Sequence, residues 1–279
     1  MPIHDQSYRR YGGRRESARS AWTVIAIEGI KSVVAKKRFL FLMLFAWIPF
    51  IVRAVQIYVS ANFPQASILA ISADTFRQFF EQQGIFVFFV TIYVGAGLIA
   101  NDRKANALQI YLSKPLTRTE YIAGKMAILV ILLLLVTWLP AVLLLVMQIL
   151  FAGSFDFARQ HAHLVPAITI FSLVQVLVAA VTMLALSAMT NSSRFAAVMY
   201  AGAVLFTDAM FQAMRGITGS SVFSWLSFPA SLAQVGDLVF RVRLRYDTPV
   251  GVSLLVLLAL VTVAASVLER KVRGVEVVA

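Results

Sequence analysis

Six apolar runs, each long enough to cross the hydrocarbon core of a bilayer as a helix, constrain this sequence more than any other feature. A segment inside lipid must satisfy its own backbone hydrogen bonds, and the residue alternation typical of a membrane β-barrel is missing from the sequence. Only 14% of the residues are charged, whereas soluble domains have roughly 25%. We therefore expect an all-α integral membrane protein with six transmembrane helices. The runs lie near 39–59, 84–100, 126–150, 164–189, 195–213 and 249–268.

The positions of the basic residues predict how the chain is oriented. With the N-terminus placed in the cytoplasm, 18 of the 25 Lys and Arg residues fall on cytoplasmic segments. The positive-inside rule therefore predicts that both termini are cytoplasmic. The net charge of +12 is explained by this topology and by attraction to anionic lipid headgroups, rather than by a nucleic-acid surface. Of the 18 cytoplasmic Lys and Arg residues, nine lie in 1–38, five in 101–125, one in 190–194 and three in 269–279. Six more lie in the outer connections 60–83, 151–163 and 214–248, and Arg53 lies within the first apolar run.

Outside the apolar runs, the chain divides into segments of different character. Residues 1–19 are polar and rich in arginine, which is typical of a disordered cytoplasmic arm, and 269–279 form a cytoplasmic tail. Residues 20–38 place apolar side chains on one arc of a helix, opposite charged ones, and predict an interfacial amphipathic helix; an amphipathic helix packed on protein is the alternative. The apolar part of 214–248 is too short to span and too apolar for a free loop, so we expect a re-entrant or interfacial element there.

The connection 101–125 is unusually polar for a segment between two apolar runs. Leu108, Tyr111 and Leu112 would share one face of a short amphipathic helix at about 102–114, which Pro115 would end. A second helix can begin at Thr117 or Thr119 as N-cap and continue into the third run. A charged connection of this kind can also be plain topology without a function.

This connection resembles the segment after the second span of the permease subunits of ABC-2 type ABC transporters. The family pattern has an acidic residue and Arg, then spaced leucines, a Ser-Arg-Pro group and a final Gly-Lys. Asn106 and Ala107 depart from it, because the family commonly has Gly and Thr there, although Asn is the best replacement for Gly in left-handed backbone. The matching positions are Asp102, Arg103, Leu108, Leu112, Ser113, Lys114, Pro115, Arg118, Gly124 and Lys125.

The resemblance implies a fold, partners and a mechanism. It implies an elbow helix before the first span and a cytoplasmic coupling helix that docks on a separate ATP-binding subunit. Two such ATPases, which hold the ATP and magnesium, would serve a pair of permeases in the bacterial inner membrane, either two copies of this chain or this chain and a homologue. An exporter-type or lipid-handling transporter is the expected activity, with a translocation path through the dimer. The implied docking residues are Asp102, Arg103, Lys104, Leu108, Tyr111, Leu112, Lys114, Pro115 and Arg118.

The chain itself is not expected to be an enzyme. Gly124 and Lys125 are followed by Met126, and Thr119 stands where a Walker A loop needs its first glycine, so ATP should bind only in the partner. The sequence contains no cysteine, which excludes disulfides and thiolate metal sites. We assign no catalytic or metal-binding residue; His161 and His163 are read as part of a loop.

Two charged residues fall inside apolar runs. Arg53 and Asp208 are each predicted about 20 Å from the cytoplasmic boundary, at about 1.5 Å per helical residue. A buried charge needs a partner, so we expect an ion pair between them; the alternatives are a contact of the pair with substrate and an Arg53 that reaches the outer headgroups alone. Asp208 also leaves open a different class of protein, a secondary transporter or a membrane assembly scaffold that is not coupled to ATP.

Overall fold

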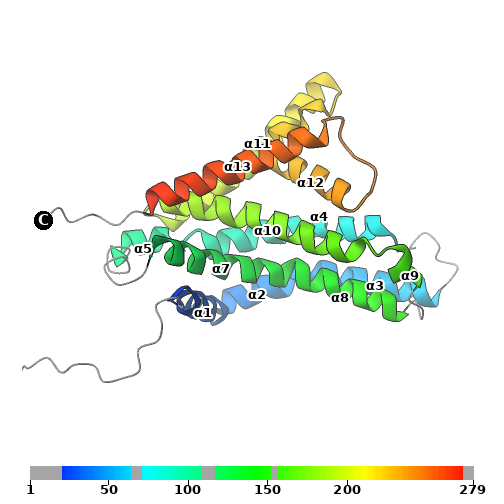
Figure 1. Cartoon of the computed structure of the whole chain (residues 1–279), viewed down its shortest axis with the longest axis horizontal. Coiled ribbons are helices and arrows are strands. Elements are labelled where there is room, and N and C mark those ends of the chain that lie inside the picture. The colour runs from blue at the N-terminus through cyan, green and yellow to red at the C-terminus, as the bar shows by residue number, and fades with distance from the viewer. Residues whose placement is uncertain (1–20, 64–70, 108–116, 152–155, 273–279) are drawn as a thin grey trace, which may run out of the picture.

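The computed structural model describes residues 21–63, 71–107, 117–151 and 156–272, and all regular structure in these ranges is helical. The proximal end of the bundle carries α1, α5 and the last turn of α13; the distal end carries the last turn of α3, α9 and the connection from α12 to α13 (Figure 1). The helices are α1 Ala21–Val34, α2 Lys37–Ala46, α3 Ile48–Asn62, α4 Ala73–Val90, a π-helix Thr91–Gly95, α5 Ala100–Lys104, α7 Arg118–Val136, α8 Trp138–Phe151, α9 Asp156–Gln160, α10 Leu164–Met189, α11 Ser193–Thr218, a 3-10 helix Val222–Leu226, α12 Phe228–Val239 and α13 Val250–Lys271.

Six helical segments of the described residues are long and apolar enough to cross a membrane, as predicted. The second begins at Ala73 rather than near residue 84, because Phe76, Phe79 and Phe80 bury one face of a segment whose other face is polar. A search for apolar runs does not detect the amphipathic turns that precede residue 84. These turns place Arg77 in a helix instead of a connection. The six segments are Lys37–Asn62, Ala73–Lys104, Arg118–Phe151, Leu164–Met189, Ser193–Thr218 and Val250–Lys271.

Two of the six segments are interrupted close to a proline. The first breaks at Trp47, two residues before Pro49, and the third breaks at Thr137, three residues before Pro140. Proline has no N–H and its ring crowds the carbonyl four residues earlier. For Pro140 that carbonyl belongs to Val136, and it accepts a hydrogen bond of 2.6 Å from Nε2 of Gln83 on α4. The carbonyl that Pro140 leaves without a helical partner thus joins the end of α7 to α4.

The helices form layers around α10. In Figure 1, α1, α2 and α3 lie on one side, α4, α7 and α10 in the middle, and α11, α12 and α13 on the other side at an angle to the rest. More than half of the most apolar stretch of α10 is buried, against 17% for α11 and for α13. The outer helices therefore expose apolar side chains, as a bilayer or a second subunit requires.

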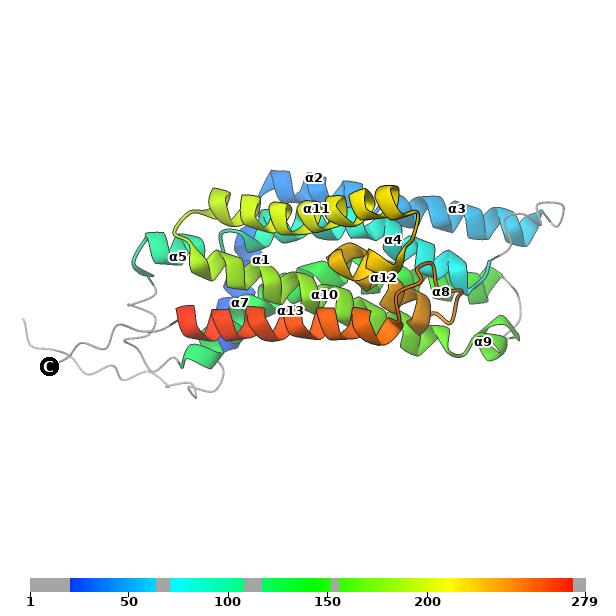
Figure 2. The same ribbon diagram turned by 90° about the horizontal axis from the view of Figure 1, so that it is seen from above.

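The transverse helix α1 packs on α7 through glycines. Figure 2 shows α1 running across the proximal end of the bundle. A Cβ added at Gly124 would lie 2.8 Å from Cβ of Ile25 and 3.0 Å from the carbonyl oxygen of Trp22, so the helices touch backbone to side chain there. Val24 and Ile27 on the other side of α1 are exposed. The predicted interfacial position of this helix stays a prediction.

We predict that Gly124→Ala destabilises the chain by about 1–3 kcal/mol, because the added methyl overpacks the contact between α1 and α7. Gly202→Ala is the matched control: it also lies in a long helix, and nothing lies within 4 Å of the added Cβ. That control should be neutral or stabilise by up to about 1 kcal/mol. Unfolding of both variants in mixed micelles measures the difference, and equal stabilities would contradict the packing described here.

Candidate functional site

A break in the second membrane segment is fixed by one serine hydroxyl. The π-helix is followed by turns at 96–99 before α5 begins, so backbone groups there lack regular helical partners. Oγ of Ser187, on α10, accepts hydrogen bonds from the N–H groups of Ile99 at 3.2 Å and Ala100 at 3.0 Å. It donates to the carbonyl of Ala96 at 2.9 Å. Ser187 is fully buried, so α10 determines where α5 starts.

Asp102 joins α5 to α7. Its Oδ2 atom accepts a hydrogen bond of 2.7 Å from the hydroxyl of Tyr121 and lies 2.6 Å from Nζ of Lys125. The same ammonium lies 5.5 Å from the centre of the Tyr121 ring, within the range of a cation–π contact. The carboxylate and ammonium are largely shielded from solvent, with 19% and 12% of their side chains exposed.

Arg103 joins the same short helix to the end of α10. Its Nε donates to Oδ1 of Asn191 at 3.1 Å, and its Nη1 donates to the carbonyl of Ala188. A cation suits this place because the last carbonyls of a helix carry partial negative charge. We call the set that holds α5 in position the α5 brace, which consists of Asp102, Arg103, Tyr121, Lys125 and Ser187.

The docking residues expected from the family resemblance thus have different surroundings. Asp102 and Arg103 bind neighbouring helices, whereas Lys104 and Arg118 are exposed. α5 ends at Lys104, Ala107 is again helical, and the rest of the helix expected at about 102–114 lies outside the described residues. Asn106 has a φ of 52°, in the left-handed region for which asparagine replaces glycine best. Leu108, Tyr111, Leu112, Lys114 and Pro115 lie outside the described residues, so the docking surface stays a prediction.

The predicted start of the third membrane segment is confirmed. Thr117 is the N-cap of α7, and its hydroxyl accepts a hydrogen bond of 3.3 Å from the N–H of Glu120. The Glu120 carboxylate accepts in return from the N–H of Thr117 at 2.9 Å, which completes a capping box.

Arg53 and Asp208 do not pair in the described residues, contrary to the sequence-based expectation. Arg53 donates to glutamine side chains, at 2.7 Å to Gln56 and 3.1 Å to Gln78. Asp208 accepts a hydrogen bond of 3.0 Å from the hydroxyl of Ser227. The reason is direction: α3 and α11 lie on opposite sides of the bundle (Figure 1), and equal depth along two helices does not make their side chains face each other.

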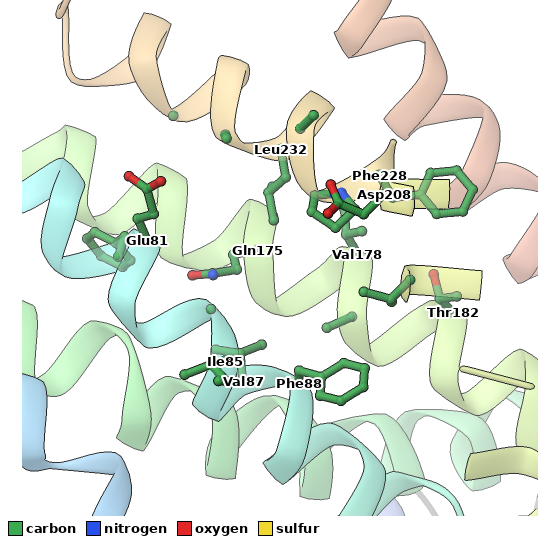
Figure 3. A pocket seen from close by; sticks show the side chains of 18 of the residues that line it. Glu81, Ile85, Val87, Phe88, Gln175, Val178, Thr182, Asp208, Phe228 and Leu232 are labelled. Carbon is green, nitrogen blue, oxygen red and sulfur yellow. The ribbon is translucent and has the colours of Figure 1, made fainter. Parts of the chain in front are cut away.

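A cavity of about 780 Å³ lies between α4, α10, α11 and α12. Its wall is mostly aromatic and aliphatic, and Figure 3 shows Phe88, Val178 and Leu232 around it together with Gln175 and Asp208. Sequence reasoning missed the cavity because its wall is assembled from four helices distant in sequence. The one signal was Asp208, an acid within an apolar run.

A cluster of ion pairs forms the distal part of the cavity wall. Arg77 of α4 lies 2.6 Å from Asp74, 3.0 Å from Glu81 and 3.5 Å from Asp237 of α12. Arg245 lies 2.8 Å from Asp237 and 2.9 Å from Glu81. Asp237 is almost fully buried, and a buried carboxylate of this kind requires such partners. The cluster ties α4 to α12 and to the segment that precedes α13.

The segment 214–248 folds back against the bundle instead of forming a free loop. Ser227, at the start of α12, reaches Asp208, which lies ten residues before the end of α11. Gln234 of α12 donates to the carbonyl of Thr248, and its Oε1 accepts from Ser253 of α13 at 3.2 Å. The apolar part of this segment therefore packs on the bundle, and the re-entrant or interfacial position expected for it stays a prediction.

Tyr246 contributes a neutral hydroxyl to the cavity wall. Burial raises the pKa of the Tyr246 phenol above its ordinary value, and the negative charge of the nearby Asp208 acts in the same direction. The phenol therefore keeps its proton at neutral pH.

Comparison with protein-family models and with curated protein sequences found no match to this chain. Among the described residues, no group of three or more His, Cys, Asp or Glu side chains could hold a metal ion. The candidate functional parts are therefore defined by geometry alone: the α5 brace at the proximal end and the cavity beside it along the bundle.

We predict that Ser187→Ala destabilises the chain by about 1–3 kcal/mol, because it leaves buried backbone groups of the broken helix without a partner. Ser172→Ala is the matched control: Ser172 is also buried on α10, but its hydroxyl donates to the carbonyl of Ile168 in its own helix. That change should cost less than about 1 kcal/mol. Hydrogen exchange at residues 96–100 provides a local readout, which should rise in Ser187→Ala only; unchanged protection would show that the hydroxyl does not hold α5.

Proposed function

We propose that this chain is the membrane-spanning permease subunit of an ATP-driven ABC transporter of the exporter type. The observation that carries the proposal is where the family-like residues lie. Asp102, Arg103 and Lys125 hold α5, and Gly124 forms the contact between α7 and α1. The residues that resemble the family's coupling segment thus take part in helix–helix contacts on both sides of residues 108–116.

The α5 brace supplies a route by which movement of a docked partner would reach the cavity. Ser187 and Arg103 join α5 to the end of α10, and the same helix lines the cavity with Gln175 and Thr182. On the other side, α5 continues from α4 through the π-helix, of which Ile92 also lines the cavity. A push on residues 101–118 would therefore move both walls together, as rigid-body coupling requires.

The complex we propose supplies the ATP-binding subunits and the second permease that this chain would need for transport. Two cytoplasmic ATPases would bind ATP and magnesium below a pair of permeases, either two copies of this chain or this chain and a homologue. The exposed cations Lys104 and Arg118 suit an interface that is guided by charge. Exposed apolar side chains along α2 and α11 suit lipid or the second permease. Both termini would lie in the cytoplasm of a bacterium, with the protein in the inner membrane.

A secondary transporter is the second candidate, and two observations favour it. Secondary transporters use titratable groups at mid-membrane and interrupted helices. Asp208 lines the cavity, and two membrane segments break near Pro49 and Pro140. In that case transport would depend on an ion gradient, and no ATPase would be required.

The experiment that separates these functions is purification of the tagged chain from membranes of its own host in mild detergent. We expect vanadate-sensitive ATP hydrolysis to accompany the chain. Leu108→Asp and Tyr111→Asp should each reduce that activity by about tenfold or more, because a charge would enter an apolar docking surface. Val222→Asp is the control, since Val222 is an apolar residue that is 45% exposed in the 3-10 helix, outside α2 and α11. If the activity survives both docking variants, or is lost equally in the control, the docking assignment is wrong.

A further inference from the structure

We infer that the cavity binds an amphipathic cation, with its ammonium group at Asp208 and its apolar body along α4 and α10. This inference deepens the proposed function and rests on it in one respect, namely that the occupant is the transported cargo. The binding itself is argued from the cavity wall alone.

The size and the composition of the cavity fit an apolar body of moderate size. Its volume of about 780 Å³ lies within the usual range of ligand pockets, roughly 300–1,000 Å³. Aromatic rings come from every side of the wall: Phe88 from α4, Phe171 from α10, Tyr200 from α11 and Phe228 from α12. Such a wall rewards the burial of a flat or flexible apolar group, and the aromatic faces also attract cations.

The charges of the wall are balanced by ion pairs except at one place. Arg77, Glu81 and Arg245 all line the cavity, and all three belong to the distal ion-pair cluster. Asp208 has no ion pair among the described residues, and its hydrogen bond comes from the uncharged Ser227. A carboxylate in apolar surroundings gains much from a counter-charge. The wall therefore favours a cation at Asp208 and repels an anion there.

Hydrogen-bond acceptors without donors occur in the same wall. Gln175 is only 5% exposed, and its Oε1 atom has no hydrogen-bond partner within the part of the chain that the structure describes. The hydroxyl oxygen of Thr182, two helical turns later on α10, also has none. Figure 3 shows Gln175, Thr182 and Asp208 around the same space. Unsatisfied buried acceptors are uncommon and costly, so a ligand that carries N–H groups would satisfy what the protein leaves open.

A cationic amine is thus a better fit than the other amphiphiles that a membrane offers. A fatty acid would place a second negative charge beside Asp208, and a neutral acyl chain would leave the acceptors of Gln175 and Thr182 unpaired. An amine supplies both the positive charge and the donors.

The test uses the full-length chain alone, in nanodiscs of phosphatidylcholine, and two fluorescent probes of equal chain length. One is an undecylamine that carries the dansyl group at the end of the chain opposite its free amine. The other is an undecanoic acid that carries the dansyl group at the end opposite its carboxylate. We expect the amine to bind at least tenfold more tightly than the acid, and Asp208→Asn to weaken amine binding by about tenfold or more. Asp247→Asn should change amine binding less than twofold, because Asp247 likewise accepts from a serine, Ser221 at 2.6 Å, but lies outside the cavity wall.

A second variant covers the case in which Asp208→Asn fails to fold. Gln175→Leu keeps a side chain of similar size, and it should weaken amine binding by about threefold to tenfold without affecting the acid. Equal binding of the two probes, or amine binding that neither variant changes, would overturn the inference.

The same experiment is independent of the proposed function, because it contains no ATPase. Selective amine binding by a chain that never carries ATPase activity would keep the cation site and reject the permease. ATPase activity in a chain without amine selectivity would keep the permease and reject the cation site.

Discussion

The hydroxyl of Ser187 is the contact on which the rest of the arrangement depends. A membrane helix cannot be broken freely, because no water is present to satisfy the backbone groups that a break exposes. In this chain the break between the π-helix and α5 is satisfied by a side chain of α10. The break therefore joins two membrane segments instead of loosening them, and it gives α5 a fixed direction. Asp102 and Arg103 then extend the same joint to α7 and to the end of α10.

The placement of charge follows from the same shortage of water. Arg77, Arg245 and Asp237 lie together in a cluster, and Lys125 is held by Asp102, so these charges neutralise one another. Arg53 is surrounded by glutamine oxygens, which are weaker partners but still acceptors. Asp208 lines the cavity as Arg77 and Arg245 do, but among the described residues it forms no ion pair and accepts its hydrogen bond from a hydroxyl. That difference is why it is the residue at which we locate a ligand.

Local features of this fold could be predicted from the sequence, whereas contacts between distant helices could not. The six membrane segments, the cap at Thr117 and the backbone at Asn106 depend on residues within a few positions of each other. The partners of Arg53 depend on how α3 is rotated about its axis, which hydropathy does not encode. The role of Ser187 was equally hidden, since a serine in an apolar run usually bonds to its own helix, as Ser172 does.

An ATPase can reach the α5 brace only if that end of the bundle faces the cytoplasm. Thiol labelling tests this directly, because the chain has no native cysteine. Lys104→Cys places an exposed thiol beside the brace, and Arg243→Cys places one in the exposed distal segment. With a membrane-impermeant maleimide on intact spheroplasts, we expect labelling of Arg243→Cys at once and of Lys104→Cys only after permeabilisation. Labelling of Lys104→Cys from outside would show that the brace does not face the cytoplasm.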